Sequence, residues 1–424
     1  MSEPSEVQVQ GLTNDADAGD GSAHKRLMLS TGALSTYIAK FLLTRVLRHI
    51  KVGALEVTFP DGTQFRVEGK PGPEATLILH NWRFVRRFFL KGDLAIAEAY
   101  MDDDWSTGSL SGLMDFGTAN LGAFRPNRFF AALFDGIGFL THRRNANTLK
   151  GSRANIAFHY DLGNAFYGAW LDPSMTYSSA LFDGSTQDVS EAQQRKYRRL
   201  AERLCLKPGD RVLEIGCGWG GFAEVAARDY GSSVVGLTLS HEQKAYADER
   251  MKRAGLDHLV DIRLEDYRHV NGTFDKIVSI EMFEAVGEEN WPVYFKVLSE
   301  RLAPEGQAAL QIITIEESLF ARYRRRIDFI QRYIFPGGML PTPEALARES
   351  IAQGLALTER VFFGSSYALT LAFWRDRFLA AWPQIATLGF DQRFKRMWLY
   401  YLCYCESGFR SGRINVGQFL LTKE

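Results

Sequence analysis

The chain lacks the charge excess and the cysteine clusters that mark several broad classes of protein. Its 50 Lys and Arg residues are balanced by 50 Asp and Glu residues, so the whole chain presents no basic field to a nucleic acid. Four cysteines occur in 424 residues, and Cys403 and Cys405 are separated by one residue, which is not a zinc-binding spacing. We therefore expect no nucleic-acid partner, no metal site and a reducing, cytoplasmic compartment.

A membrane span and a secretion signal are also missing. The most apolar long segment, residues 27–50, is interrupted by Lys40, Arg45 and Arg48, whereas a transmembrane helix needs roughly 18 uncharged apolar residues in succession. Residues 1–25 are acidic and polar, where a signal peptide needs a basic start and an apolar run. We predict a disordered tail over 1–25 and membrane contact, if any, at the membrane surface.

The chain divides into two patterns. Residues 26–120 combine a one-faced helix, a hairpin around Asp61-Gly62 and a stretch that mixes aromatic and basic residues, which predicts a small N-terminal α+β domain. A Gly-rich and Asn-rich linker follows over 121–150. Residues 151–424 form the second predicted domain.

In this second domain, strands and helices alternate from about residue 205. The strand-like segments DRVLEIGCGWGG, SSVVGLTLS, VDIRLEDY, DKIVSIEMFEAVG and GQAALQIITI are separated by helical segments. This order predicts an α/β fold with a doubly wound, Rossmann-like parallel sheet. Residues 316–424 are interpreted as a helical and loop-rich section with many aromatic residues.

A glycine turn joins the first of these strands to a helix. Gly216 and Gly218 stand in this turn, where glycine lets the backbone approach a ligand without a Cβ in the way. Such a turn could also serve a dinucleotide enzyme. Glu214, two residues before the first glycine, makes the segment resemble the first motif of class I methyltransferases, whose ligand is S-adenosylmethionine.

The next two strands end in polar residues. The second strand lacks the terminal acidic residue that many such enzymes use for the ribose hydroxyls, so Thr238 and Gln243 are the candidates to hold the ribose or the methionine moiety. Asp266 and Tyr267 follow the third strand and are placed to meet the adenine.

Seven motifs, taken in order, make the chain resemble the cyclopropane-fatty-acyl-phospholipid synthase family. They are HYDLGN at 159–164, LDPSMTYS at 171–178, GCGWGG, GLTLS, MFEAVG, YIFPGG and AAWPQI. The resemblance runs from about 155 to 424, and residues 27–120 look like the small lipid-interacting domain of the phospholipid-acting members. It implies transfer of a one-carbon unit from S-adenosylmethionine to the double bond of an unsaturated acyl chain in a membrane phospholipid.

The resemblance also assigns the cofactor-binding residues. They are Tyr177 and Ser178 at the methionine end, Gly216 and Gly218 in the backbone cradle, Thr238 and Gln243 in the middle, and Asp266 and Tyr267 at the adenine.

Methyl transfer to an alkene leaves a carbocation that must be shielded from water and must lose a proton. Aromatic walls are available from the C-terminal section, with Phe362, Phe363, Tyr367, Phe373, Trp374, Trp398, Tyr400 and Tyr401. In family members that make cyclopropanes, bicarbonate serves as the base and is held by a Cys, a Glu, a His and a Tyr. The resemblance places Glu284 and Tyr367 in this set, and we predict them as catalytic residues.

The other two positions of that set have changed. The Cys position is Ser179 and the His position is Gln311. Both side chains can still hydrogen-bond an anion, so bicarbonate stays an option, but Glu281 or Glu406 could instead act as the base. The product is correspondingly open between a cyclopropane and a methylene-branched, methyl-branched or furan-precursor acyl chain. A non-catalytic lipid-binding protein is the alternative from another class.

Two basic clusters interleaved with aromatic residues predict contact with lipid phosphates. One holds Arg322, Arg324, Arg325 and Arg326, and the other holds Arg83, Arg86, Arg87 and Lys91. The expected partners are a membrane phospholipid, met peripherally at the inner membrane, and a second copy of the chain, because family members of this size are often dimers.

Overall fold

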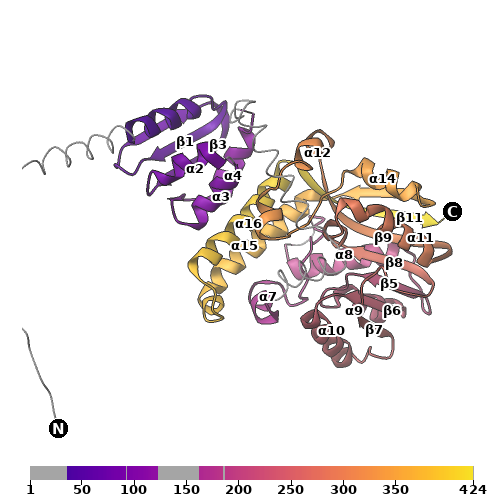
Figure 1. Ribbon diagram of the computed structural model, residues 1–424. Helices are drawn as coiled ribbons and strands as arrows, with labels where there is room; N and C mark the ends of the chain where they lie inside the picture. The colour runs from indigo at the N-terminus through magenta and orange to yellow at the C-terminus, as the bar shows by residue number, and fades with distance from the viewer. Residues whose placement is uncertain (1–35, 92, 123–161, 185–186, 424) are drawn as a thin grey trace, which may run out of the picture. The chain divides into compact units, whose positions relative to one another are not determined.

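The computed structural model describes residues 36–91, 93–122, 162–184 and 187–423 (Figure 1). The predicted tail at 1–25 and nearly all of the predicted linker at 121–150 lie outside these residues. The chain divides into two units, Met1–Arg48 and His49–Glu424. In the first unit, residues 36–47 form the predicted helix, and several of its large apolar side chains are exposed.

The second unit begins with a four-stranded sheet of order β2-β1-β3-β4. Strands β1 (Val52–Thr58) and β2 (Gln64–Glu68) form the predicted antiparallel hairpin. The turn between them contains Gly62 at φ +78°, a conformation that glycine adopts without strain. Strand β3 (Lys70–Leu79) runs parallel to β1 and pairs with the short β4 (Trp105–Ser106). Helices α2 (Arg83–Lys91), α3 (Asp93–Met101) and α4 (Leu110–Ala119) complete this α+β region.

Two of the arginines predicted to meet lipid are used inside this region. The Asp104 side chain is completely buried and accepts hydrogen bonds from Arg83 at 2.7 Å and from Arg87 at 2.9 Å. A buried carboxylate needs such partners because its desolvation is otherwise too costly. Arg83 and Arg87 therefore stabilise the fold, and Phe84 is a core residue beside them.

A seven-stranded sheet of order β10-β11-β9-β8-β5-β6-β7 dominates the rest of the chain. The strands β5 (Arg211–Ile215), β6 (Ser233–Thr238), β7 (Val260–Leu264), β8 (Phe274–Ile280) and β9 (Leu302–Ile315) are mutually parallel. They confirm the predicted doubly wound α/β fold.

The prediction for the C-terminal section was wrong in one respect, because two strands lie within it. Strand β11 (Ile414–Lys423) pairs antiparallel with both β9 and β10 (Leu355–Phe362) and extends the sheet. The alternating exposure of β10 suits the edge position that it occupies.

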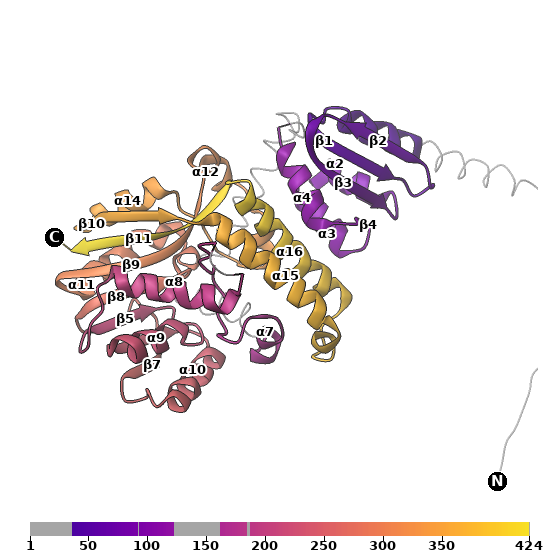
Figure 2. The ribbon, with the colours of Figure 1, turned by 180° about the vertical axis from the view of Figure 1, so that it is seen from behind.

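Helices cover both faces of this sheet (Figures 1 and 2). One face packs against α8 (Val189–Arg203), α9 (Gly221–Tyr230) and α10 (His241–Ala254), and the other against α11 (Trp291–Arg301) and α14 (Pro343–Ile351). Successive strand residues alternate between the two cores, as Val212 and Leu213 do. Burial of each large aliphatic side chain contributes roughly 1.5–3 kcal/mol.

A pair of long helices, α15 (Gly364–Ala386) and α16 (Gln392–Arg410), packs side by side, and the short helix α7 (Asn164–Trp170) lies against α15. Helix α16 also reaches the small sheet, where the Arg396 guanidinium donates to the Trp105 carbonyl at 2.6 Å and lies 4.2 Å from the Tyr100 ring centroid. Among the described helices, none combines the length and apolarity that a membrane span requires.

Candidate active site

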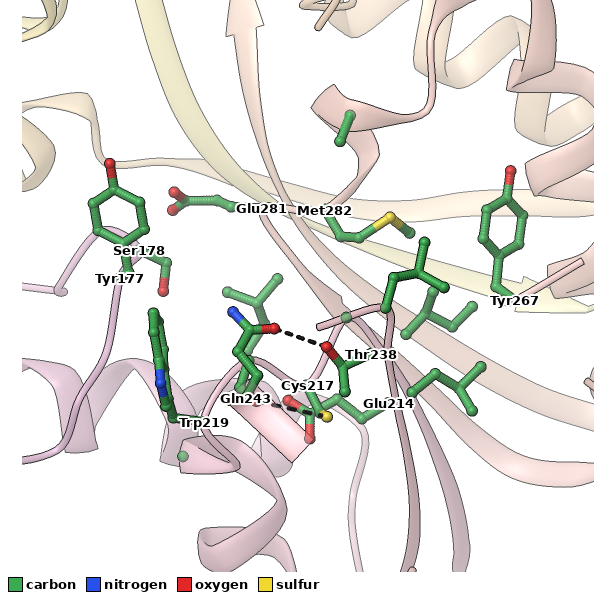
Figure 3. A pocket seen from close by; sticks show the side chains of 18 of the residues that line it. Tyr177, Ser178, Glu214, Cys217, Trp219, Thr238, Gln243, Tyr267, Glu281 and Met282 are labelled. Atoms are coloured by element: carbon green, nitrogen blue, oxygen red, sulfur yellow. Dashed lines mark hydrogen bonds between the residues drawn. The ribbon is translucent and has the colours of Figure 1, made fainter. Parts of the chain in front are cut away.

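A cleft opens at the carboxyl ends of β5, β6, β7 and β8, where the strand order reverses direction and ligands of open α/β sheets bind. Residues from the segment before α8 and from the segments after β5, β6, β7 and β8 meet there (Figure 3). All eight residues predicted to bind the cofactor line this one cleft: Tyr177, Ser178, Gly216, Gly218, Thr238, Gln243, Asp266 and Tyr267. Their individual roles stay predictions.

The glycine turn after β5 has the backbone conformation that glycine allows. Gly216 and Gly218 have φ values of +83° and +53°. A Cβ at Gly216 would stand 2.7 Å from the Met282 Cγ, whereas a Cβ at Gly218 would meet nothing within 4 Å and would enter open space. A side chain at 216 would therefore clash as well as strain the backbone.

Glu214 leaves a buried acceptor beside this turn. Burial raises the pKa of Glu214 to about 8, although the backbone N–H of Ala223 donates to its carboxylate. Its Oε2 is buried and has no hydrogen-bond partner among the described residues. Such an orphaned oxygen in a cleft fits a ligand that brings a cation or a donor.

The polar groups along the cleft are held by their neighbours. The Thr238 hydroxyl donates to the Gln243 Oε1 at 2.8 Å, which turns the Gln243 amide nitrogen away from Thr238 (Figure 3). Farther along, Arg268 donates to both carboxylate oxygens of Asp266, at 2.8 and 2.7 Å, and lowers the pKa of Asp266. Tyr267 lies at the end of the cleft opposite Tyr177 and Ser178 (Figure 3).

A tryptophan in the glycine turn is fixed by the first of the family-like motifs. The Trp219 indole N–H donates to the Asn164 Oδ1 at 2.7 Å, and Asn164 in turn donates to the Glu242 carbonyl. Trp219 lines the cleft. Through these two hydrogen bonds, Asn164 connects α7 to the glycine turn and to the start of α10.

Aromatic rings continue from this turn to the other end of the cleft. Tyr167 packs 5.1 Å from Trp219 and 5.4 Å from Tyr177, measured between ring centroids. Tyr177 then packs against Trp374, and its hydroxyl lies 2.7 Å from the Tyr401 hydroxyl. Trp398 and Tyr367 extend the wall, whereas Phe362 is 38% exposed and packs on Phe419 of the sheet, so it is not part of the wall.

Glu281 stands where this wall meets the cleft, directly after β8. Its Oε1 accepts hydrogen bonds from the Ser179 backbone N–H at 2.9 Å and from the Gln311 side chain at 2.8 Å. Its Oε2 accepts one from the Tyr367 hydroxyl at 2.6 Å. Desolvation raises the pKa of Glu281, and these hydrogen bonds together with the nearby Lys196 oppose the rise. Two of the side chains predicted to hold an anion, Gln311 and Tyr367, therefore converge on Glu281. The third predicted residue, Ser179, contributes its backbone N–H, and its hydroxyl donates instead to the Ala180 carbonyl.

Glu284 follows Glu281 in the sequence and, unlike Glu281, is not among the residues that line the cleft. Its Oε1 accepts the Ile313 backbone N–H, its main-chain carbonyl accepts the Met339 N–H at 2.8 Å, and its Oε2 is buried without a partner among the described residues. Desolvation, followed by the charge of Glu281, raises the pKa of Glu284 to about 8. Its predicted catalytic role stays a prediction, and the contacts present fasten the segment after β8 to β9.

Glu406, the other candidate base, is buried between two arginines. Its carboxylate pairs with Arg375 and with Arg410. Guanidinium groups thus engage both of its carboxylate oxygens, and Glu406 is not among the residues that line the cleft.

The sequence analysis missed Lys196. Its side chain is fully buried on α8, and its Nζ donates to the Ser178 Oγ at 2.6 Å. Its neighbours in the run KYRRLAER suggest a solvated face. The spacing of the buried positions Val189, Ala192, Gln193, Lys196, Tyr197 and Leu200 places it on the inner face of the helix and was the available signal.

The chain is similar to several known proteins. The family model described as mycolic acid cyclopropane synthetase matches residues 147–419. A tuberculostearic acid methyltransferase of Mycobacterium tuberculosis is 36% identical over 407 residues, which cover 92% of each chain. The cyclopropane-fatty-acyl-phospholipid synthase of Escherichia coli is 38% identical over 384 residues, covering 87% of this chain and 96% of that protein.

A solved structure of similar fold is a mycolic acid cyclopropane synthase complexed with SAH and CTAB. It is 32% identical, has a TM-score of 0.61, and the alignment covers 64% of this chain and 98% of that one.

Proposed function

Because the chain belongs to the mycolic acid cyclopropane synthetase family and is an S-adenosylmethionine-dependent enzyme, we propose that it alkylates the double bond of an unsaturated acyl chain in a membrane phospholipid and that Glu281 is the base. The observation that carries this proposal is the Glu281 carboxylate held by three donors at one end of the cofactor cleft. Related proteins are named for acting on fatty-acyl phospholipids and on mycolic acids.

The cleft residues fit S-adenosylmethionine. Bound there, it supplies an electrophilic methyl group on a sulfonium. The orphaned Oε2 of Glu214 suits its ammonium group, and the open space beside Gly218 suits close approach of its backbone. Tyr267, at the far end of the cleft, offers a ring to the adenine.

Glu281 occupies the position that a bound anion would need. A bicarbonate would have to be held by the Ser179 backbone, the Gln311 amide and the Tyr367 hydroxyl, and Glu281 already engages all three. We therefore propose that this enzyme carries its base as a side chain and needs no bicarbonate. Tyr367 and Glu284 serve it as positioning residues.

The reaction follows from these positions. Formation of the new carbon–carbon bond to the transferred methyl leaves a carbocation on the acyl chain. Trp374 packs against both Tyr177 and Tyr367, and the Tyr367 hydroxyl donates to Glu281, so this aromatic wall is available to stabilise the cation and exclude water. Glu281 takes a proton from the added methyl, and the electron pair of that C–H bond closes the ring. The products are a cyclopropane, a protonated Glu281 and the demethylated cofactor.

A second product class is favoured by the same observation. A carboxylate fixed by three hydrogen bonds removes whichever proton the cation presents to it. After a hydride shift, loss of a proton from the added methyl leaves a methylene branch, and loss of a proton from the chain leaves a methyl-branched alkene. A saturated methyl branch requires a separate reductant. A relative similar over 92% of this chain is named a methyltransferase and not a cyclopropane synthase.

We further propose that the enzyme meets the membrane peripherally, from the cytoplasmic side. The helix over 36–47 exposes Tyr37, Ile38, Phe41 and Leu42, which is the apolar surface that an interfacial helix needs. Arg325 is exposed just after α12 (Glu317–Tyr323), where it can meet lipid phosphate. The four cysteines are free thiols, as a reducing compartment requires.

Purified full-length protein tests the function with vesicles of monounsaturated phosphatidylglycerol and S-adenosylmethionine carrying a CD3 methyl group. Gas chromatography with mass spectrometry of the acyl methyl esters should find ring or methylene products that keep two of the three deuterium atoms, whereas a methyl-branched alkene formed by loss of a chain proton keeps all three. Hydrogenation separates ring from methylene. An absence of label from the acyl chains, with the label found elsewhere on the lipid, would contradict the proposal.

A further inference from the structure

Lys196 is a buried amine with one hydrogen-bond partner among the described residues, and that partner belongs to the cofactor cleft. Its side chain is 0% exposed, and the Ser178 Oγ, 2.6 Å away, is the only hydrogen-bond acceptor that the described part of the chain gives it. An ammonium group has three N–H donors. Two of them are therefore unmatched in a place that water does not reach.

Three carboxylates and one tyrosine ring lie around Lys196. Glu281 after β8, Asp172 after α7 and Glu214 on β5 act on it, and Tyr197 lies beside it on α8 with its ring centroid 4.4 Å from the Nζ. Burial lowers the pKa of Lys196 to about 7 even though the three carboxylates oppose the shift. None of the three makes a hydrogen bond to it, so the amine lacks an anion in contact.

The position of Ser178 in the cleft indicates which anion could pair with Lys196. Tyr177 and Ser178 lie at the end of the cleft opposite Tyr267 (Figure 3). In the proposed function, this end of the cleft binds the methionine part of the cofactor. That end of the cofactor carries one carboxylate and one ammonium. The orphaned Oε2 of Glu214 suits the ammonium, and a serine hydroxyl whose oxygen accepts from Lys196 is free to donate its own proton to the carboxylate.

We propose that Lys196 is a positioning residue of the cofactor site: through Ser178 it provides the buried positive charge that binds the amino-acid carboxylate and so fixes which way the methionine end lies. This inference rests on the proposed function. Glu214 and the Lys196–Ser178 pair then recognise the two opposite charges of one zwitterion. Their separation sets where the sulfonium methyl points, which must be toward the acyl chain for an in-line transfer.

Two ligands and three variants test this by calorimetric titration. The ligands are S-adenosylmethionine and its decarboxylated analogue, which keeps the amine, the sulfonium and the adenosine. Lys196→Met keeps the length of the side chain and removes its charge, Ser178→Ala removes the connecting hydroxyl, and Lys296→Met removes an exposed lysine of α11 as the matched control.

We expect Lys196→Met and Ser178→Ala each to weaken binding of S-adenosylmethionine about 10-fold or more, as loss of a hydrogen bond to a charged group does. Both should leave binding of the decarboxylated analogue within about twofold. Lys296→Met should change neither. Ser178→Ala decides the question if Lys196→Met does not fold, as judged by circular dichroism.

Equal losses for both ligands would assign Lys196 a structural role and overturn this inference alone. Failure of the wild-type protein to bind either ligand would overturn the proposed function and this inference together.

Discussion

At the scale of single residues, Glu281 combines a strained backbone with a carboxylate that three donors hold. Its φ is +52°, a conformation that costs a non-glycine residue about 1 kcal/mol. Glycine would adopt it freely. Strain of this kind persists where surrounding structure enforces it, and here it aims a carboxylate at the cleft from the end of β8.

Replacement of Glu281 by glycine should therefore remove the base without disturbing the backbone. The Ser179 N–H, the Gln311 amide and the Tyr367 hydroxyl would then surround an anion-sized space. We expect Glu281→Gly to be inactive in bicarbonate-free buffer and to regain activity when formate or bicarbonate is added. In Glu281→Gln, the matched control, the amide fills the same space and the added anions should have no effect. Rescue of both variants, or of neither, would argue against the anion-site interpretation.

The raised pKa of Glu284 should be detectable in the pH dependence of the protein's stability. With a pKa of about 8 in the folded chain and near its usual value when unfolded, it holds a proton in the native state over a range where the unfolded state has lost it. The native state binds more protons there, so this group's contribution to stability falls as pH rises from about 4.5 to about 8.

Glu284→Gln removes that dependence, because glutamine keeps an oxygen for the Ile313 N–H and cannot ionise. Thermal unfolding between pH 5 and pH 9 should show a smaller fall in Tm for this variant, with the variant more stable than the wild type at pH 9. Parallel Tm curves would show that Glu284 is ionised in the folded protein.

Six of the eight predicted cofactor residues lie at or after the ends of strands β5, β6 and β7, and the carboxyl ends of parallel strands meet at one edge. Tyr177 and Ser178, which precede these strands, were assigned by the family resemblance alone. Sequence reasoning could not decide among the candidate bases. That choice depends on which carboxylate meets donors from three other elements, as Glu281 does, and which meets arginines, as Glu406 does. Lys196 was missed because a lysine among charged neighbours indicates an exposed position, although its spacing from the apolar residues of α8 indicates a buried one.

At the scale of elements, α7 and the glycine turn are joined by one side chain. Asn164, at the start of α7, accepts from the Trp219 indole and donates to the Glu242 carbonyl. Asn164→Ala should free the turn and weaken binding of S-adenosylhomocysteine about fivefold, the effect of roughly one hydrogen bond. Titration calorimetry measures it against Asn271→Ala, which removes an exposed amide that does not line the cleft. Equal affinity in both variants would mean that the turn holds its shape without α7.

The parallel strands could be predicted from sequence and the last two strands could not. Strands β5 to β9 alternate with helices, and this alternation is a local pattern. Strand β11 joins β9 after about a hundred intervening residues, and its antiparallel pairing gives no local signal of which sheet it enters. The edge strand β10 is found only once β11 is placed beside it.

At the scale of the whole molecule, the proposed membrane contact should depend on charge. Neutralising Arg324, Arg325 and Arg326 together should weaken binding to anionic vesicles and reduce its salt sensitivity, with about 1 kcal/mol for each arginine that reaches lipid. Arg324 pairs with Glu288 at 2.7 Å, which reduces the charge that it can offer to lipid.

Co-sedimentation with phosphatidylglycerol vesicles measures this, with neutralised Lys252, Arg253 and Arg348, which lie on α10 and α14, as the matched control. An unchanged bound fraction for the Arg324 triple variant would leave the apolar helix over 36–47 as the membrane contact to test. The predicted domain boundaries and the homodimer stay predictions.

The central claim, that Glu281 is the resident base, is tested most directly by the turnover of Glu281→Gln on unsaturated phospholipid vesicles, with cofactor affinity measured in parallel. We predict turnover lower than wild type by orders of magnitude, as loss of a proton acceptor in the chemical step entails, with binding of S-adenosylmethionine nearly unchanged. Wild-type turnover in Glu281→Gln, with the same acyl product by mass spectrometry, would contradict the claim and return the base to bicarbonate or Glu284.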